Sequence, residues 1–149
     1  MKTHIIGCGG VTSYFLPPFL RTLKHIRHPR LRQHPVVLHD GDILEERNLQ
    51  RQNFQQAHLL ETEDVFKSAC LGLDNMWYPN LTAELAYIDT AFVVEDRDTI
   101  IVCADNHLAR KHALEAADRA VGVNVLSAAN STIGAEAWWY DATVMRETP

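Results

Sequence analysis

A short apolar run that ends in an acidic turn constrains the fold of this chain more than any other feature. Residues 36–38 are Val-Val-Leu, bounded by Pro35 and by the turn Asp40-Gly41-Asp42. This is the pattern of a short, buried β-strand. Asp40 then lies at the carboxyl end of a strand, where open α/β sheets place their ligand sites. The run therefore predicts both a sheet and an edge of that sheet at which a ligand binds.

A glycine-rich turn follows an earlier apolar run. Ile5 and Ile6 precede the turn Gly7-Cys8-Gly9-Gly10, and a helix is expected to open just after it. Glycines let the backbone approach a phosphate closely, and the free N–H groups at a helix start favour an anion. An acidic side chain about one βαβ unit later can bind a ribose hydroxyl. The two fragments together predict one half of a nucleotide site.

Strands and helices alternate along the rest of the chain. We expect strands at 3–6, 36–38, 81–88, 99–103, 123–128 and 135–140, and helices after Gly10, at 63–76 and at 106–121. Residues 43–56 are expected to form short helical turns. Pro17-Pro18 predicts a kink or restart of the first helix near Leu16, because proline removes a backbone hydrogen bond. The alternation predicts the α/β class, with a Rossmann-like, doubly wound, mostly parallel sheet.

Composition narrows the classes of function. A chain of 149 residues predicts one domain, 1–149. The formal net charge of −5 argues against nucleic acid as a partner, and no apolar run is long enough for a membrane span. The first residues already form a strand, which leaves no signal peptide. Three cysteines make neither a paired disulfide set nor a zinc motif, so we expect a reduced, cytoplasmic protein.

Four motifs in this order resemble the signature of the ThiF/MoeB/HesA superfamily, the ubiquitin-activating-enzyme-like adenylyltransferases. They are the glycine turn, the segment Asp40-Gly41-Asp42 with Asn48-Leu49-Gln50-Arg51-Gln52, Lys67, and Cys103-Ala104-Asp105-Asn106. The resemblance extends from Ile5 to about Tyr140. Two shorter stretches, Gly7-Cys8-Gly9-Gly10 and Leu16-Pro17-Pro18, also resemble ThiF-like proteins of plasmids and phages.

The resemblance implies ATP and Mg²⁺ as cofactors. It assigns catalysis to Arg51, Lys67 and Asp105, with Asp105 holding the magnesium bound to ATP. The residues it implies for cofactor binding are Gly7, Gly9, Gly10, Asp40, Asp42, Asn48, Arg51, Gln52, Lys67 and Asn106. A guanidinium such as that of Arg51 suits bidentate recognition of phosphate, and Mg²⁺ needs only one or two carboxylates beside phosphate oxygens.

The implied reaction is ATP-dependent adenylation of the C-terminal carboxylate of a ubiquitin-like or sulfur-carrier protein. A homodimer is the family's usual assembly. The chain departs from the family in lacking an N-terminal helix that lends an arginine to the partner subunit, and we expect it to lack the family's C-terminal segments. A non-catalytic nucleotide-binding module and an NAD-dependent oxidoreductase are the alternatives; the second shares the glycine turn and Asp40.

Each implied polar residue also has a structural interpretation. Asp40 or Asp42 can bond the backbone of its own turn, and Asp105 can cap the helix that follows it. Arg51 can pair with nearby glutamates on the surface, and Lys67 lacks the usual Gly-x-x-Lys lead-in and can be a solvated helix lysine.

Cys8 and the pair Trp138-Trp139 also allow either a functional or a structural role. Cys8 lies beside a helix start, where the pKa of a thiol is often lowered, or it simply fills the turn. Cys70 and Cys103 are expected to be small core residues. The two tryptophans point to opposite faces of the last strand, and at a sheet edge one of them can mark a subunit contact.

Overall fold

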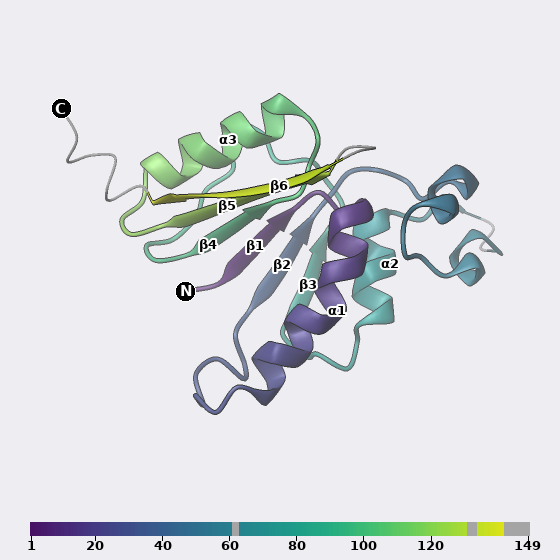
Figure 1. Ribbon diagram of the computed structural model, residues 1–149, viewed down its shortest axis with the longest axis horizontal. Helices are drawn as coiled ribbons and strands as arrows, with labels where there is room; N and C mark the ends of the chain where they lie inside the picture. Colours follow the sequence, from purple (N-terminus) through teal and green to yellow (C-terminus); the bar gives the residue numbers. More distant parts are fainter. Residues whose placement is uncertain (61–62, 131–133, 142–149) are drawn as a thin grey trace.

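The strands of the computed structural model form one sheet (Figure 1), and the structure describes residues 1–60, 63–130 and 134–141. In these residues the sheet has six strands in the order β3-β2-β1-β4-β5-β6. They are β1 (Thr3–Ile6), β2 (Val36–His39), β3 (Leu81–Glu84), β4 (Thr99–Val102), β5 (Asn124–Asn130) and β6 (Ala135–Asp141). β1 to β5 run parallel, and β6 pairs antiparallel with β5. The predicted α/β class with a Rossmann-like, mostly parallel sheet is confirmed.

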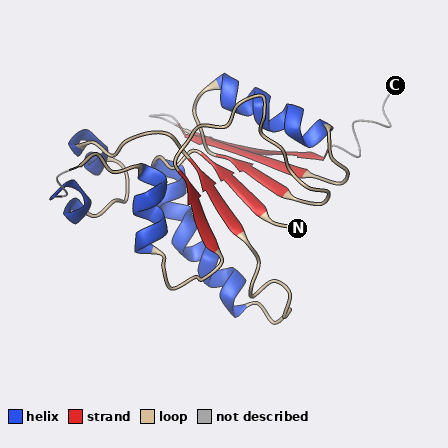
Figure 2. Cartoon of the chain, turned by 180° about the vertical axis from the view of Figure 1, so that it is seen from behind, coloured by secondary structure: helices blue, strands red, loops and turns tan. Residues whose placement is uncertain are grey.

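Helices cover both faces of the sheet (Figures 1 and 2). On one face lie α1 (Gly10–His25) and α2 (Lys67–Asp74), and on the other lies α3 (His107–Asp118). Side chains alternate along β1 accordingly: Ile5 packs in the core under α1 and α2, and Ile6 packs in the core under α3. Two short 3₁₀ helices, η1 (Glu46–Gln50) and η2 (Gln56–Leu60), lie in the connection from β2 to α2. No helix among the described residues is long and apolar enough to cross a membrane.

The helix α1 continues through both prolines, so the expected restart near Leu16 is wrong. Pro17 has no N–H to donate to the carbonyl of Ser13, and that carbonyl instead accepts a hydrogen bond from Nδ2 of Asn53 at 3.4 Å. The Thr22 hydroxyl donates to the carbonyl of Pro18 at 2.9 Å. The Asn53 side chain therefore replaces one of the two backbone bonds that the prolines remove.

The helix α2 begins at Lys67, four residues later than the predicted start. Phe66 forms an antiparallel bridge with Ile43, and the Leu44 N–H donates to the carbonyl of Val65 at 2.8 Å. This pairing holds the residues before Lys67 in an extended conformation. It also brings the start of α2 to the acidic turn, where the Lys67 N–H donates to the carbonyl of Asp42 at 2.9 Å.

The strand order places a topological switch point between β1 and β4. The chain leaves β1 toward β2 on one side, and β4 continues toward β5 on the other. Ligands of open α/β sheets bind in the crevice at the carboxyl ends of the strands beside such a point. The glycine turn, the acidic turn at Asp40 and the segment containing Asp105 each follow one of these strand ends.

Candidate functional site

The glycine turn is held by the ends of two neighbouring strands. Gly7 has a φ of +90°, and a Cβ there would lie 2.7 Å from the backbone nitrogen of Ala104, after β4. Only glycine fits this position, because an L side chain would meet both strain and a clash. The Gly7 N–H donates to the carbonyl of His39 at 2.9 Å, and the Cys8 N–H donates to Oδ2 of Asp40 at 2.5 Å.

Asp40 is buried, with 5% of its surface exposed, and both its carboxylate oxygens accept backbone hydrogen bonds. Oδ2 holds Cys8, and Oδ1 accepts from the Asp42 N–H at 2.7 Å. Burial raises the pKa of Asp40, although the two backbone hydrogen bonds oppose that rise. The turn-bonding interpretation of Asp40 is therefore confirmed as one of its roles. A carboxylate has about four acceptor sites, so the same group retains capacity for a ligand hydroxyl.

Asp42 and Lys67 form an ion pair at the start of α2. Nζ of Lys67 lies 3.0 Å from Oδ2 of Asp42, and only 9% of the lysine side chain is exposed. The hydroxyl of Tyr87 donates to Oδ1 of Asp42. Burial alone would raise the pKa of Asp42, but the hydrogen bonds from Tyr87 and Lys67 outweigh it and keep that pKa below its usual value. Lys67 is thus largely buried beside the turn, and the interpretation as a solvated helix lysine is wrong.

Asn48 lies in the middle of η1 and Arg51 directly follows it, and their side chains differ in their bonding. Asn48 is buried, and its Oδ1 accepts from the Glu45 N–H at 2.9 Å as half of a capping box. Arg51 is exposed, and within the described residues its side chain makes no ion pair or hydrogen bond. Glu45 instead pairs with Arg47. The guanidinium of Arg51 is therefore available to a ligand.

Gln52 faces the glycine turn. Its Nε2 lies 3.9 Å from the position of a Cβ built on Gly9, and its Cγ lies 3.9 Å from that built on Gly10. Oε1 of Gln52 is buried and has no hydrogen-bond partner. Buried polar atoms normally have a partner, so this carboxamide is a group that a bound ligand or water would satisfy.

Two roles were considered at the start of α3, a helix cap and a metal ligand; Asn106 takes the first, and Asp105 stays available for the second. Asn106 is the N-cap, and its Oδ1 accepts from the Ala109 N–H at 2.7 Å. The helix-cap interpretation of Asp105 is therefore wrong. Asp105 is exposed, and no partner of its carboxylate is found in the described part of the chain. It follows Ala104, whose backbone packs against Gly7, so residue 105 adjoins the segment that contacts the glycine turn and carries oxygens of the kind that Mg²⁺ prefers.

The thiols are not placed for chemistry. Cys8 is fully buried, and burial together with the Asp40 carboxylate raises the pKa of its thiol well above the usual range. The lowered pKa considered for Cys8 is wrong, because the nearby charge is an anion and water is excluded. Burial also raises the pKa of Cys70, to about 11, and that of Cys103. All three thiols are free, and no group of three or more metal-binding side chains occurs among residues that the structure describes.

Sequence reasoning missed Tyr87 as part of the site. A Cβ on Gly41 would lie 2.7 Å from Cδ2 of Tyr87, so the ring rests directly on the backbone of the acidic turn. Tyr87 follows β3 at the same edge of the sheet as the other site residues, and that position was the available signal. Nε of Arg110, on α3, is buried without a hydrogen-bond partner.

No protein-family model matches the chain, and no curated protein sequence matches it. Solved structures of the enzyme MccB from E. coli do resemble it. The structure titled MccB with succinimide is 18% identical, with a TM-score of 0.67, over 93% of this chain and 39% of that chain. The structure of MccB with ATP is 20% identical, with a TM-score of 0.57, over 85% of this chain and 36% of that chain.

A third MccB structure, with MccA-N7isoASN, is 18% identical, with a TM-score of 0.61, over 86% of this chain and 35% of that chain. The present chain thus spans somewhat over a third of the MccB chains. At these identities the likeness establishes the shared fold.

Proposed function

We propose that this chain binds ATP and Mg²⁺ at the carboxyl edge of its sheet and adenylates the C-terminal carboxylate of a peptide or small carrier protein. The observation that carries the proposal is the meeting of the glycine turn with Asp40 on one side and Ala104-Asp105 on the other, at the switch point of the sheet. Arg51 and Gln52 close the same turn from the η1 side. The MccB structures support it, since their titles name ATP, and AMPCPP together with MccA, as bound molecules.

Each site residue has a role that its surroundings permit. The N–H groups at the start of α1 face the phosphates, and Asp40 accepts from the ribose hydroxyls. The unpaired guanidinium of Arg51 binds phosphate oxygens, and Asp105 holds Mg²⁺. Bound Mg²⁺ would supply neutralisation of the phosphate charge. Lys67 is paired with Asp42, and its ammonium group adds positive charge near the phosphates.

The reaction needs positioning more than covalent help from the protein. A carboxylate oxygen of the substrate attacks the α-phosphorus of ATP, the bond from that phosphorus to the β-phosphate oxygen breaks, and pyrophosphate leaves. Such a step is accelerated by orientation and by stabilisation of the developing charge. The acyl-adenylate is then the product that leaves this domain, because Cys8 is buried and un-ionised and offers no thiolate to accept the acyl group.

The finer proposal is that the substrate is a ubiquitin-like or sulfur-carrier protein and that the chain acts as a homodimer. The exposed edge strand β6 supports the second point: Trp138 and Trp139 are 44% and 67% exposed on it. Tryptophans exposed on an edge strand are typical of a contact surface.

A non-catalytic nucleotide-binding module is the second candidate. The observation that favours it is the Asp42–Lys67 ion pair, because a lysine already neutralised by a carboxylate stabilises phosphate charge less well. An NAD-dependent oxidoreductase ranks third, since it gives no role to the unpaired Arg51 or to Asp105.

A thermal-shift titration separates ATP from NAD. A ligand at ~100 times its dissociation constant adds about 2.7 kcal/mol to the free energy of unfolding. We expect the melting temperature to rise with ATP plus Mg²⁺ and to change little with NAD. A rise with NAD that equals or exceeds the rise with ATP would reject the adenylation proposal.

Exchange of radiolabelled pyrophosphate into ATP separates the enzyme from the binding module. We expect exchange that depends on a peptide or carrier with a free C-terminal carboxylate, and none with the same substrate amidated at that end. If the protein binds ATP but no carrier supports exchange of pyrophosphate, the result would favour the non-catalytic nucleotide-binding module.

A further inference from the structure

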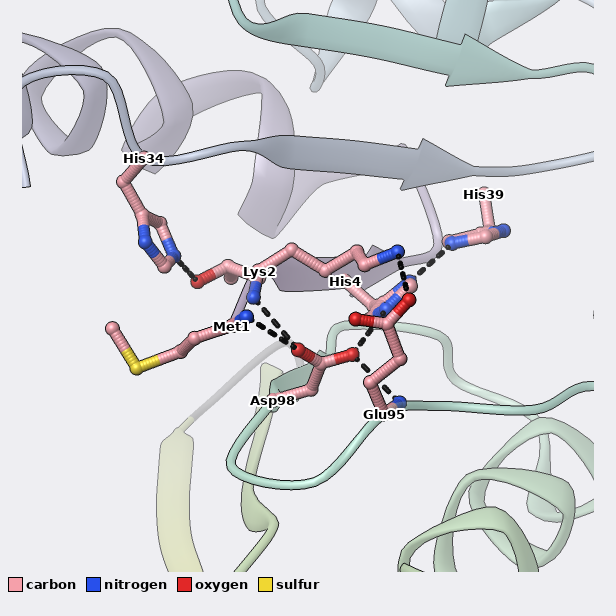
Figure 3. A network of polar contacts seen from close by, with 8 residues as sticks. Met1, Lys2, His4, His34, His39, Glu95 and Asp98 are labelled. Carbon is pink, nitrogen blue, oxygen red and sulfur yellow. Dashed lines mark hydrogen bonds and ion pairs between the residues drawn. The ribbon is translucent and has the colours of Figure 1, made fainter.

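Two histidines, His4 and His39, join β1 to β2 on the face of the sheet that α3 covers (Figure 3). Nδ1 of His4 lies 3.0 Å from Nε2 of His39, and the two rings stack with centroids 5.2 Å apart. Nε2 of His4 lies 3.3 Å from Oδ2 of Asp98. His4 and His39 are called the histidine pair below.

Asp98 decides which nitrogens carry protons. Its side chain is fully buried and accepts hydrogen bonds from the N–H groups of Lys2, at 2.7 Å, and Glu95, at 2.9 Å. A carboxylate only accepts, so Nε2 of His4 donates to it. Nδ1 of a neutral His4 is then bare, and Nε2 of His39 donates to it. The hydrogen-bond network thus assigns both tautomers of the histidine pair.

The surroundings keep the histidine pair neutral. The ring of Phe92 packs edge-on against both imidazoles, with centroids 5.4 Å from His4 and 5.2 Å from His39. Burial lowers the pKa of His39 to about 4. It also lowers the pKa of His4, against the raising effect of the Asp98 carboxylate. Both rings are therefore uncharged at neutral pH.

The charged and titratable groups around the histidine pair come from every neighbouring segment. From the start of β1 they are the N-terminal amine, 3.8 Å from Asp98, and the ammonium of Lys2, which bonds Glu95 at 3.2 Å. From the loop before β4 they are Glu95 and Asp98. From α3, His112 bonds the carbonyl of Ile88, and from the residue after α3, Arg119 donates to the carbonyl of Phe92 at 2.7 Å. The cluster carries charges of both signs around a neutral centre.

His39 connects this cluster to the candidate site. Its carbonyl accepts the Gly7 N–H, and the next residue, Asp40, holds the Cys8 N–H with its carboxylate. Two successive N–H groups of the glycine turn are therefore bonded to the last residue of β2 and its neighbour. The His39 side chain ties that same strand end to β1.

We propose that the histidine pair is a proton-sensitive positioning element for the glycine turn. Its neutral form holds His39 and Asp40 against Gly7 and Cys8, and a proton on the pair releases this strand end and weakens binding of the nucleotide. The effect on nucleotide binding rests on the proposed function, whereas the loosening of the turn does not.

Protonation of His39 changes the surroundings that its ring needs, because a charged ring requires hydration. A proton added at the bare Nδ1 of His39 places a full charge on a partly buried ring that packs against Phe92. The charged ring gains hydration by turning away from His4, which breaks the hydrogen bond between the two rings. The strand end then loses its side-chain tie to β1, so the backbone bond from the Gly7 N–H to the carbonyl of His39 opens more often.

Amide hydrogen exchange tests the loosening without any ligand. Opening that restores an ordinary histidine pKa changes the closed-to-open ratio by about eightfold between pH 7 and pH 5.5. After correction for intrinsic exchange, protection of the Gly7 and Cys8 amides should fall by this factor in the wild type. The Cys70 amide in α2, which bonds the carbonyl of Phe66, serves as the reference and should not change.

Three variants assign the effect. His39→Gln removes the titrating ring and should make protection at Gly7 and Cys8 independent of pH. His4→Gln removes the ring to which His39 donates and should lower that protection already at pH 7. His34→Gln is the matched control, because His34 is a buried histidine that bonds the Thr3 hydroxyl at 2.8 Å outside the pair, and it should keep the wild-type response. A wild type with no fall, or a His39→Gln variant with the wild-type fall, overturns the proposal. The wild-type measurement decides alone where a variant does not fold.

Titration with ATP tests the consequence for the ligand. The Kd for ATP should rise more from pH 7 to pH 5.5 in the wild type than in His39→Gln, by at most the roughly eightfold change in the closed-to-open ratio. Protonation of the terminal phosphate is common to both proteins and cancels in this comparison. Equal pH dependence in the two proteins contradicts the link to nucleotide binding. Absence of ATP binding at every pH refutes the proposed function. The amide hydrogen-exchange experiment still decides whether the histidine pair positions the glycine turn.

Discussion

Two groups of polar residues meet at the candidate site, and they differ in how their hydrogen bonds are satisfied. The paired group, Asp40, Asp42, Asn48 and Lys67, is bonded within the protein, and three of its members are 7% exposed or less. The open group consists of Arg51, Gln52 and Asp105. Arg51 and Asp105 are exposed without side-chain partners in the part of the chain described, and Gln52 has a buried, unpaired Oε1.

The paired group therefore stabilises the structure of the site, whereas the open group has hydrogen-bonding groups available to a ligand. Removing one partner of a buried hydrogen bond leaves the other unsatisfied, which destabilises the fold whether or not a ligand is present. Removing an exposed, unpaired group changes stability little but deletes a contact to the ligand. Mutations in the two groups should therefore be distinguishable in the absence of nucleotide.

Gly7→Ala should produce the largest loss of stability. A left-handed φ costs alanine about 1–2 kcal/mol, and overpacking against the backbone of Ala104 costs about 1–3 kcal/mol, so we expect about 2–5 kcal/mol in all. Urea unfolding measures this loss. Gly10→Ala is the control, since a Cβ there meets its nearest neighbour at 3.7 Å in ordinary contact. Equal losses at the two glycines would contradict the close approach of the turn to β4.

Asp40→Ala tests the paired group directly. The variant leaves the N–H groups of Cys8 and Asp42 without their carboxylate acceptor, and hydrogen bonds to charged groups contribute about 1.5–3 kcal/mol each. We expect a loss of about 3 kcal/mol in urea unfolding without ligand. Asp105→Ala should stay within about 0.5 kcal/mol of the wild type. If Asp105→Ala were as destabilising as Asp40→Ala, the division into two groups would fail.

Arg51→Ala tests the open group. Loss of a charge-assisted contact to phosphate should weaken ATP by about thirtyfold, equivalent to about 2 kcal/mol, while AMP binding and stability without ligand change little. Isothermal calorimetry with both nucleotides measures the effect. Arg47→Ala is the matched control, because Arg47 is another exposed arginine, on η1, and it already pairs with Glu45. A similar loss of AMP affinity would move Arg51 away from the outer phosphates.

The smallest effect is the pH dependence of stability that His39 contributes. Its pKa is lowered from 6.5 to about 4 in the folded protein, so the unfolded chain binds the proton more tightly. Stability is therefore lost as the pH falls below 6.5, by about 1.3 kcal/mol between pH 7.5 and pH 5.5. Urea unfolding at both values should show this loss in the wild type and a smaller one in His39→Gln. A loss of the same size in both proteins would assign the effect to other groups.

Local patterns were sufficient to predict most of the elements. The strand at residues 3–6 was predicted with its observed bounds, and a helix was expected just after Gly10, where α1 begins. These predictions succeeded because apolar runs and glycines act over a few neighbouring residues. The start of α2 was predicted too early, because Phe66 pairs with Ile43 at a distance in sequence that no local pattern reports.

Residue types and spacing alone determined the α/β class, the edge of the sheet at which Asp40 lies, and the set of polar residues that follow strand ends. Only the tertiary structure decided which of them are already bonded. Lys67 bonds Asp42, which lies 25 residues away in the sequence. Cys8 bonds Asp40 over 32 residues, and His4 bonds Asp98 over 94 residues. Hydrogen bonds and burial depend on the three-dimensional neighbours of a side chain, and those neighbours come from strand order and register rather than from adjacent residues.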